Sequence, residues 1–210
     1  MKFRLAPVLA AILLSACARE NLYLEGGVYT FRSSCPVVGV PAATGDITLF
    51  NPPSSRTAAA IDVTATMTNV RSTCQDVGDQ VVSTTTFDVL AIRRNPTDAR
   101  QVVLPYFTAA VQGGSQVVAK RVGHVAVTFA PGEYRAQTSG QATVRVSRAA
   151  ATLPEDVVRT LNRRRRPGDP DAAIDPLTDP TVRAAVARAT FEHLVGFHLT
   201  NDQLRYNATR

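Results

Sequence analysis

Apolar and polar residues alternate along much of the middle of this chain. The strictest run is IDVTATMT at residues 61–68, in which every second residue is apolar. A period of two residues is typical of a half-buried strand, because successive side chains point to opposite faces of a sheet. Threonine on the polar side suits a pleated surface. The pattern therefore predicts a strand at 61–68.

Looser strand patterns flank this run, and turn-forming residues separate most of them. Predicted strands lie at 28–32, 46–50, 81–92, 102–111, 117–129 and 142–146, with turns at 51–53, 77–79, 95–98, 113–115 and 131–132. Pro105 lacks an N–H group, so it predicts an edge or bulged position for its strand. Many short strands without intervening helices favour a mainly β fold, an antiparallel immunoglobulin-like β-sandwich, with a small barrel as the alternative.

The pattern changes after Ala149. Thr152, Pro154 and the acidic pair after it predict a helix that ends near Arg164, and Pro180 begins a second short helix ending near 189. The Pro-rich, charged segment between them has little to bury. Alternation resumes at 190–200, where residues 191, 193, 195, 197 and 199 share a face, and residues 200–204 predict a capped terminal turn. We therefore expect a β-sandwich domain made of 28–150 and 190–210, with a helical, mobile, Arg/Pro-rich insertion at 151–189 before the last strand.

The N-terminus carries an export signal. Lys2 and Arg4 precede an apolar stretch at 5–14 that is shorter than the ~20 residues of a spanning helix. The tetrapeptide Leu14-Ser15-Ala16-Cys17 resembles the bacterial lipoprotein signal. The resemblance implies that residues 1–16 are a signal peptide, that Cys17 is lipidated, and that 17–27 form a tether. An ordinary cleaved signal with a coincidental cysteine is the alternative. Ala18, in place of an aspartate, favours the outer membrane, with the protein facing the periplasm.

Two cysteines remain once Cys17 carries the lipid. Cys35 and Cys74 form an even pair in an oxidising compartment, which predicts a disulfide; a metal or redox pair is the alternative. The net charge of +6 falls to +4 when Lys2 and Arg4 are removed with the signal. The mature chain is rich in arginine, which suits phosphate binding, although a GC-rich genome produces the same bias. At 45% hydrophobic, the chain can fill a sizeable core.

Few residues suggest chemistry. The sequence holds no common nucleophile, metalloprotease or phosphate-loop motif, so we expect no catalytic residue, metal or cofactor. His124, His193 and His198 are spread out, and we interpret them as surface histidines or as strand histidines with satisfied hydrogen bonds. The run Arg163, Arg164, Arg165 and Arg166 is a candidate anion-binding site, with a solvated helix end as the alternative. In the periplasm its ligands would be anionic lipids or acidic proteins, not nucleic acid.

The C-terminus carries a more specific pattern. Gly196-Phe197-His198-Leu199-Thr200, Gln203-Leu204 and Tyr206-Asn207 resemble the C-terminal signature of a group of small Gram-negative envelope lipoproteins. Weaker similarity covers 104–107 and 118–120. The resemblance implies an envelope lipoprotein and no particular activity.

Together these features predict a non-catalytic interaction or assembly module that is anchored to the membrane by lipid and contacts an envelope protein. A strand edge near Pro105 or the Arg-rich insertion would offer the contact surface. The alternative is a module that binds a lipid or another amphiphile.

Overall fold

The structure is a computed structural model that describes residues 33–163 and 165–209. The predicted signal peptide, Cys17, the tether and the predicted strand at 28–32 lie outside the described residues. The strands are β1 (Val37–Gly39), β2 (Asp46–Phe50), β3 (Ile61–Val77), β4 (Gln80–Arg93), β5 (Arg100–Gln112), β6 (Gln116–Phe129), β7 (Arg135–Ser147) and β8 (Phe191–Phe197). The helices are α2 (Arg148–Ala151), α3 (Glu155–Asn162), α4 (Pro180–Arg188) and α5 (Asn201–Thr209), with single 3₁₀ turns η2 (Ala58–Ala60) and η3 (Pro176–Thr178).

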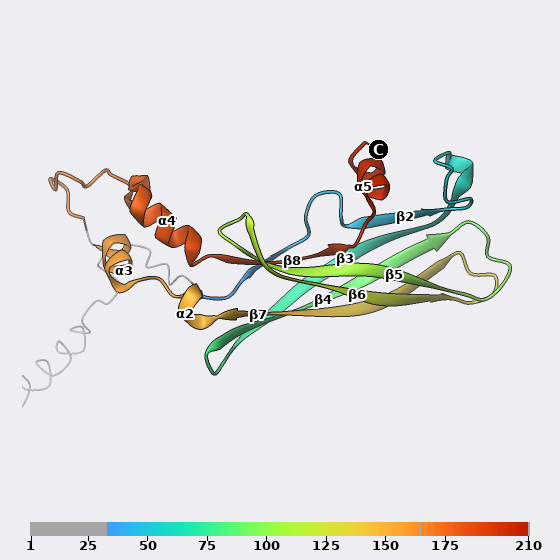
Figure 1. The fold of residues 1–210 in the computed structure, drawn as a ribbon, viewed down its shortest axis with the longest axis horizontal. Helices are drawn as coiled ribbons and strands as arrows, with labels where there is room; N and C mark the ends of the chain where they lie inside the picture. The colour runs from blue at the N-terminus through green and yellow to red at the C-terminus, as the bar shows by residue number, and fades with distance from the viewer. Residues whose placement is uncertain (1–32, 164, 210) are drawn as a thin grey trace, which may run out of the picture. The chain divides into compact units, whose positions relative to one another are not determined.

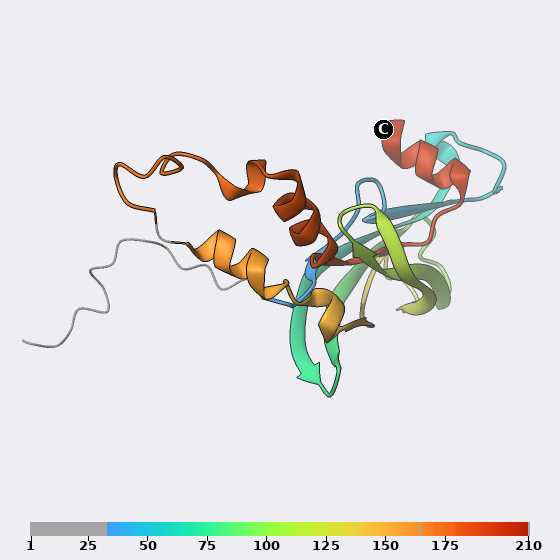
Figure 2. The same ribbon diagram turned by 60° about the vertical axis from the view of Figure 1, so that its left-hand side comes forward.

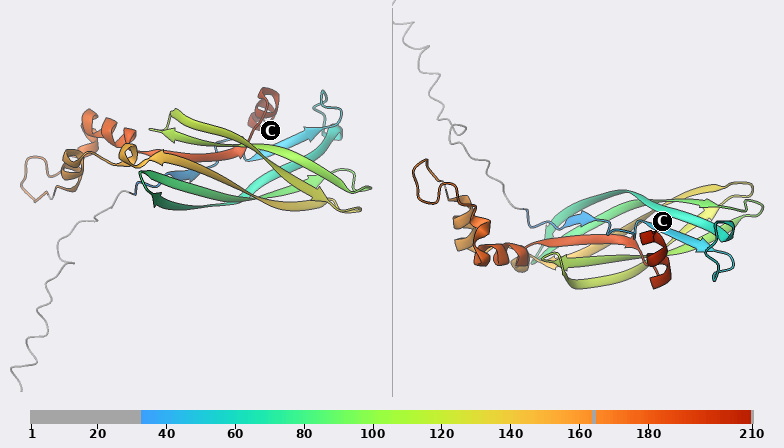
Figure 3. Two further views of the ribbon diagram at one scale, coloured as in Figure 1. Left: turned by 60° about the horizontal axis from the view of Figure 1, so that its bottom comes forward. Right: turned by 90° about the horizontal axis from the view of Figure 1, so that it is seen from above.

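The strands form two four-stranded sheets that lie face to face (Figures 1 and 3). Their strand orders are β1-β8-β5-β6 and β2-β3-β4-β7, which we call the first and second sheet. Neighbouring strands run antiparallel in both, apart from the parallel pair β1 and β8. The prediction of a mainly β fold with antiparallel sheets in a sandwich-like arrangement is therefore confirmed.

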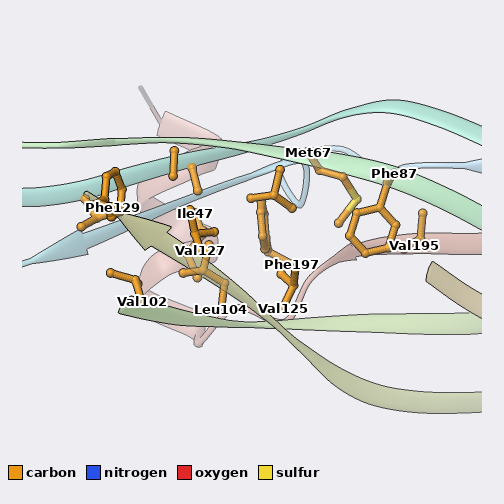
Figure 4. Packing of buried hydrophobic residues seen from close by; sticks show 14 of the residues in the cluster. Ile47, Met67, Phe87, Val102, Leu104, Val125, Val127, Phe129, Val195 and Phe197 are labelled. Carbon is orange, nitrogen blue, oxygen red and sulfur yellow. The ribbon is translucent and has the colours of Figure 1, made fainter. Parts of the chain in front are cut away.

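Inward-facing apolar side chains of both sheets make one core (Figure 4). Phe87 of β4 and, from the first sheet, Phe129 and Phe197 all belong to this cluster, and all three rings are fully buried. Alternation explains the contributions of each strand: in β4 the buried residues are those at odd positions. Burial of so many large apolar groups is the main force holding the sheets together.

The interior continues toward the end of the sandwich where the helical connection begins. There a second cluster joins Val81, Ala110, Val144, Val146, Ala151 and Phe191, with Cys35 and Cys74 against it. Cys35 and Cys74 form a disulfide with an S–S distance of 2.10 Å, which confirms the predicted pairing. The bond links the segment before β1 to residues 69–77 of β3, which we call the outer half of this strand.

Pro105 does not mark an edge strand. β5 lies inside the first sheet, between β8 and β6, and the irregularity in its ladder falls at Ala110 and Val111. Proline is tolerated because β8 pairs with β5 only from Tyr106 onward, so Pro105 lies just past the end of that ladder. Its carbonyl still accepts from the His198 N–H at 2.9 Å.

The chain passes from β7 of the second sheet to β8 of the first through α2, α3, η3 and α4. Helices α3 and α4 lie side by side (Figure 2) and share a small apolar cluster around Val157, Val182 and Ala185. Both helices were predicted, although the first spans only Glu155–Asn162. Asp179 caps α4 by accepting from the Thr181 N–H at 2.8 Å, and Pro180 follows it at the first helical position. None of the helices among the described residues is long and apolar enough to span a membrane.

The predicted terminal turn is the start of a full helix, α5. The Thr200 hydroxyl accepts from the Gln203 N–H at 3.2 Å, and the Gln203 side chain accepts from the Thr200 N–H at 2.9 Å. This reciprocal pair is a capping box, which satisfies two donors that a helix start leaves free. The helix therefore continues to Thr209.

Candidate functional site

The only histidine in the interior of the described residues is His193 on β8. Its Nδ1 lies 3.0 Å from both the Ser83 and the Thr85 hydroxyl of β4, and its Nε2 lies 2.8 Å from the Thr108 hydroxyl of β5. Hydroxyl groups donate and accept, so they satisfy either tautomer of a neutral ring. Burial lowers the pKa of His193 from its ordinary value of 6.5 to about 4. The ring is neutral at pH 7.

A serine beside a histidine is also the start of a hydrolytic site, but here both side chains are fully buried. No substrate could reach them in this conformation. The cluster instead joins the two sheets by hydrogen bonds through the core, because Ser83 and Thr85 belong to one sheet and His193 and Thr108 to the other. The interpretation of His193 as a strand histidine with satisfied hydrogen bonds is confirmed. Sequence reasoning missed its partners, although alternation places Ser83 and Thr85 on the buried face of β4.

In the described part of the chain, the other titratable groups do not gather into a site. No group of three or more His, Cys, Asp or Glu side chains suited to a metal occurs among residues 33–163 and 165–209. Asp88 lines a shallow surface groove of about 440 Å³ on the second sheet. Its carboxylate accepts from Ser139 at 2.7 Å and from Asn69 at 2.8 Å, and these bonds lower its pKa. The hydrogen bonds of the Asp88 carboxylate to Ser139 and Asn69 therefore give it a structural role in the second sheet.

The arginine run lies between α3 and η3, and Arg164 falls outside the described residues. Arg163 and Arg165 share one carboxylate, with N–O distances to Asp171 of 3.1 and 3.6 Å. The sequence places Asp169, Asp171, Asp175 and Asp179 close behind the four arginines, so the segment from 163 to 179 has no net charge. The structure thus gives the run local partners, and its binding of anions stays a prediction.

The most unusual surface is the first half of β6. Every residue from 116 to 122 is exposed, whereas the second half of the strand alternates normally into the core. Val117, Val118 and Val122 are 58%, 45% and 47% exposed. An edge strand that shows several large apolar side chains to solvent is uncommon, and contiguous apolar surface of this kind marks contact sites.

The opposite sheet explains why this half of β6 has two exposed faces. The second core cluster joins Val144 and Val146 of β7 to Ala110 of β5 and Phe191 of β8, and it contains no residue of β6. β7 therefore lies beneath β5 and β8 at this end, and β6 extends past it. Figures 1 and 2 show the β5–β6 turn, in yellow-green, splayed away from the teal β3–β4 turn. We call residues 116–124 the β6 ledge.

Pairing with β5 assigns the side chains of the ledge to its two faces. Lys120 and Val122 lie on the outer face, because Val125, Val127 and Phe129 define the inner one. Beyond the register shift, Val117 pairs with Val111, which also places it on the outer face. Exposed Val103 and half-buried Phe107 of β5 extend this apolar face, and the Lys120 ammonium lies 5.2 Å from the Phe107 ring centre. Ala119 and Arg121 lie on the inner face.

The ledge itself is basic, since its charged residues are Lys120 and Arg121. Strands β5, β6 and β7 contain no aspartate or glutamate, and Glu192 of β8 lies near the β5–β6 turn at Gly114. Arg100 and Arg135 lie at the opposite end of the strands, where they pair with Phe129 and Ile92. Within the described part of the chain, Arg100 is paired with Asp62, while Lys120 and Arg121 form no ion pair. The ledge thus combines exposed valines, two cations without an ion-pair partner among the described residues, and a strand edge that no described strand covers.

Sequence reasoning did not single out this surface, although it named a strand edge near Pro105 as a candidate contact. A signal was present: residues 116–122 mix valine, lysine and arginine without the strict alternation of a half-buried strand. Comparison with protein-family models, with curated proteins and with solved structures finds no match for this chain.

Proposed function

We propose that this protein is a lipid-anchored envelope lipoprotein that acts as a non-catalytic interaction or assembly module in a periplasmic complex. The observation that carries the proposal is the β6 ledge, since it exposes apolar and basic side chains on a strand whose free edge is open. The ledge is part of a strand whose second half is packed in the sandwich core, which suits a docking role, because little ordering would be needed on binding. The export signal with Cys17 supports the membrane anchor, and Ala18 supports an outer-membrane location facing the periplasm.

We further propose an immunoglobulin-like relationship of the sheets, with the helical connection as an insertion before the last strand. The strand count and the face-to-face sheets support the first part. The separate apolar cluster of α3 and α4 supports the second. The alternative function, binding of a lipid or amphiphile, has less support, because large side chains such as Phe87 and Phe129 fill the space between the sheets.

Photo-crosslinking in intact cells tests the function. A crosslinking amino acid at Val118 or Val122 should yield one discrete adduct with an envelope protein. The same amino acid at Ile92, which is equally exposed on the other sheet, is the matched control and should yield none. A double variant Lys120→Glu/Arg121→Glu should lose the adduct. The proposal is wrong if the ledge positions give no adduct, or if Ile92 gives the same one.

The anchor is tested separately by metabolic labelling with a fatty-acid analogue. The natural protein should carry the label and sediment with membranes, whereas a Cys17→Ala variant should carry none. Label on the Cys17→Ala variant would contradict lipidation at this residue.

A further inference from the structure

The open edge of β6 suggests how a partner binds. An edge strand presents unpaired N–H and C=O groups along one side, and an extended chain can satisfy them by adding a further strand to the sheet. We propose that the β6 ledge receives an extended acidic segment of another protein by strand addition. This inference rests on the proposed function and names the chemistry of the partner and the mode of contact.

The exposure of the ledge favours an added strand over contact by one face alone. Along residues 116–122 both faces and the edge are accessible, so a paired strand would meet no neighbouring element of the second sheet. An added strand would place its side chains beside Val118 and Val122 on the outer face and beside Ala119 and Arg121 on the inner face. Neighbouring side chains on one face of a sheet are close enough to interact.

The two positive charges of the ledge favour an added strand that carries acidic residues. Lys120 points to one face and Arg121 to the other, and neither has a carboxylate partner among residues 33–163 and 165–209. An added strand with acidic residues at neighbouring positions would pair with both, and valines or other apolar residues between them would cover Val118 and Val122. Opposite charges across a strand pair stabilise it, and like charges destabilise it.

The same charges argue against a second copy of this chain. Antiparallel pairing of two β6 edges around residue 120 would place Lys120 against Lys120 and Arg121 against Ala119, with four cations in one short ladder. Lysine on an edge and an irregular register are devices by which edge strands avoid pairing with themselves. β6 has both, since the ladder shifts between Ala110 and Val111. The edge therefore rejects its own copy and accepts an oppositely charged chain.

Binding of defined peptides to the body of the protein, with native residues from 18 onward, tests the inference. The ligand is a blocked peptide of about ten residues alternating valine and glutamate, long enough to pair with the whole ledge. The matched control peptide alternates valine and lysine. By amide hydrogen exchange, the glutamate peptide should protect every second amide of residues 116–124, because alternate N–H groups of a strand face the free edge. The lysine peptide should protect none of them.

A charge exchange makes the test specific. The variant Lys120→Glu/Arg121→Glu should bind the glutamate peptide about tenfold more weakly or worse, and it should prefer the lysine peptide. The double variant Arg159→Glu/Arg183→Glu, at exposed positions of α3 and α4, is the control for net charge and should behave like the natural protein. The inference is overturned if the glutamate peptide leaves the exchange of β6 unchanged, or if the variant keeps the original preference.

Its failure is distinguishable from failure of the proposed function. A ledge adduct in cells without amide protection by the peptide would keep the function and reject strand addition. Amide protection without any adduct in cells would keep strand addition as a property of this edge and reject the proposed function.

Discussion

His193 shows how one buried side chain sets the acid sensitivity of the protein. Protonation would place a charge between the sheets, beside the hydroxyls of Ser83, Thr85 and Thr108 and the backbone of β1. No charged side chain among the described residues is hydrogen-bonded to the ring. Because its folded pKa of about 4 lies below the ordinary 6.5, the folded state prefers the neutral ring. The contribution to stability is complete above pH 6.5 and is lost as the pH falls toward 4.

We therefore expect the free energy of unfolding to fall by about 3 kcal/mol between pH 7.5 and pH 4, as measured by urea unfolding. A His193→Gln variant, which keeps polar atoms but does not titrate, should lose this slope. His198→Gln is the control, because His198 is exposed. Asp62, Asp88 and Asp179 also have lowered pKa values, but their contributions are lost mainly below the ordinary value of 3.8, and His193→Gln retains all three. An unchanged slope in His193→Gln would contradict the assignment.

Arg93 is the second buried polar group that decides stability. Its side chain is 3% exposed and lies over the Phe129 ring, with its guanidinium 5.0 Å from the ring centre. The guanidinium donates to the carbonyls of Asp98, Pro96, Ala130 and Glu133 at 2.5, 2.8, 2.8 and 2.8 Å. One side chain thus fixes the loop between β4 and β5 to the loop between β6 and β7. A planar fork of donors is needed for this geometry.

We expect Arg93→Met to lower the free energy of unfolding by about 3 kcal/mol or more, because four hydrogen bonds from one charged side chain would be lost and the two loops would lose their shared contact. Arg93→Lys should recover only part of the loss, since an ammonium cannot reach all four carbonyls. Chemical denaturation measures both variants. Arg135→Met at an exposed position of β7 is the control and should lie within about 0.5 kcal/mol of the natural protein. If Arg93→Met and the natural protein had the same free energy of unfolding, the Arg93 contacts would make no net contribution to stability.

At the scale of elements, most residues of the C-terminal sequence pattern have a structural role in leading into α5 or in docking it. Gly196 leaves room for Thr44, whose hydroxyl oxygen would lie 2.3 Å from an added Cβ. Phe197 is in the core and Thr200 caps the helix. Tyr206 then meets the Phe50 ring at 5.1 Å, and Asn207 donates to the carbonyls of Ala43 and Asp46 at 2.9 and 2.7 Å. The pattern therefore describes how the chain end is docked on β2.

Because no residue of α5 is buried, its docking depends on these few contacts. We expect Asn207→Ala to raise the amide exchange rates of α5 at least tenfold while the urea midpoint of the sandwich stays within error, since the helix can open locally. Arg205→Ala is the control, because Arg205 is exposed and pairs only within the helix. Loss of the whole fold in Asn207→Ala would show that α5 is part of the cooperative unit.

The elements also show what sequence reasoning can reach. Strict alternation predicted the first half of β3 and the face of β8 that carries His193, because both strands are buried on one side. The outer half of β3 and the β6 ledge have two exposed faces, so burial imposes no period on them. The partners of His193 and the carbonyls around Arg93 come from strands and loops far apart in sequence. Alternation in the sequence predicts which face of the sheet a side chain lies on. Which residues it contacts there depends on the order of the strands in both sheets, which alternation does not give.

At the scale of the whole molecule, two strand segments project at the end of the sandwich where the helical connection begins. The β6 ledge extends past β7, and the outer half of β3 also has two exposed faces. Of these two segments, only the outer half of β3 is covalently linked to another part of the sandwich, because Cys74 forms a disulfide with Cys35. Cys74 also packs against the second core cluster. A bond between residues 39 positions apart restricts the unfolded chain, which contributes roughly 3–4 kcal/mol in the chain-entropy model. The ledge has no disulfide among the described residues, and its outer edge is open because β6 is the last strand of its sheet.

This contrast predicts separable effects. A Cys35→Ala/Cys74→Ala variant should lose roughly 3–4 kcal/mol of unfolding free energy by chemical denaturation in oxidising buffer. In reducing buffer the natural protein should fall to the level of the variant, because both then lack the bond. Near pH 7 the folded variant should still bind the valine–glutamate peptide at the ledge, since Ala110 and Phe191 keep β5 and β8 against β7 without the disulfide. Loss of peptide binding in a folded variant would mean that the disulfide positions the ledge, and the two hairpins would then act as one unit.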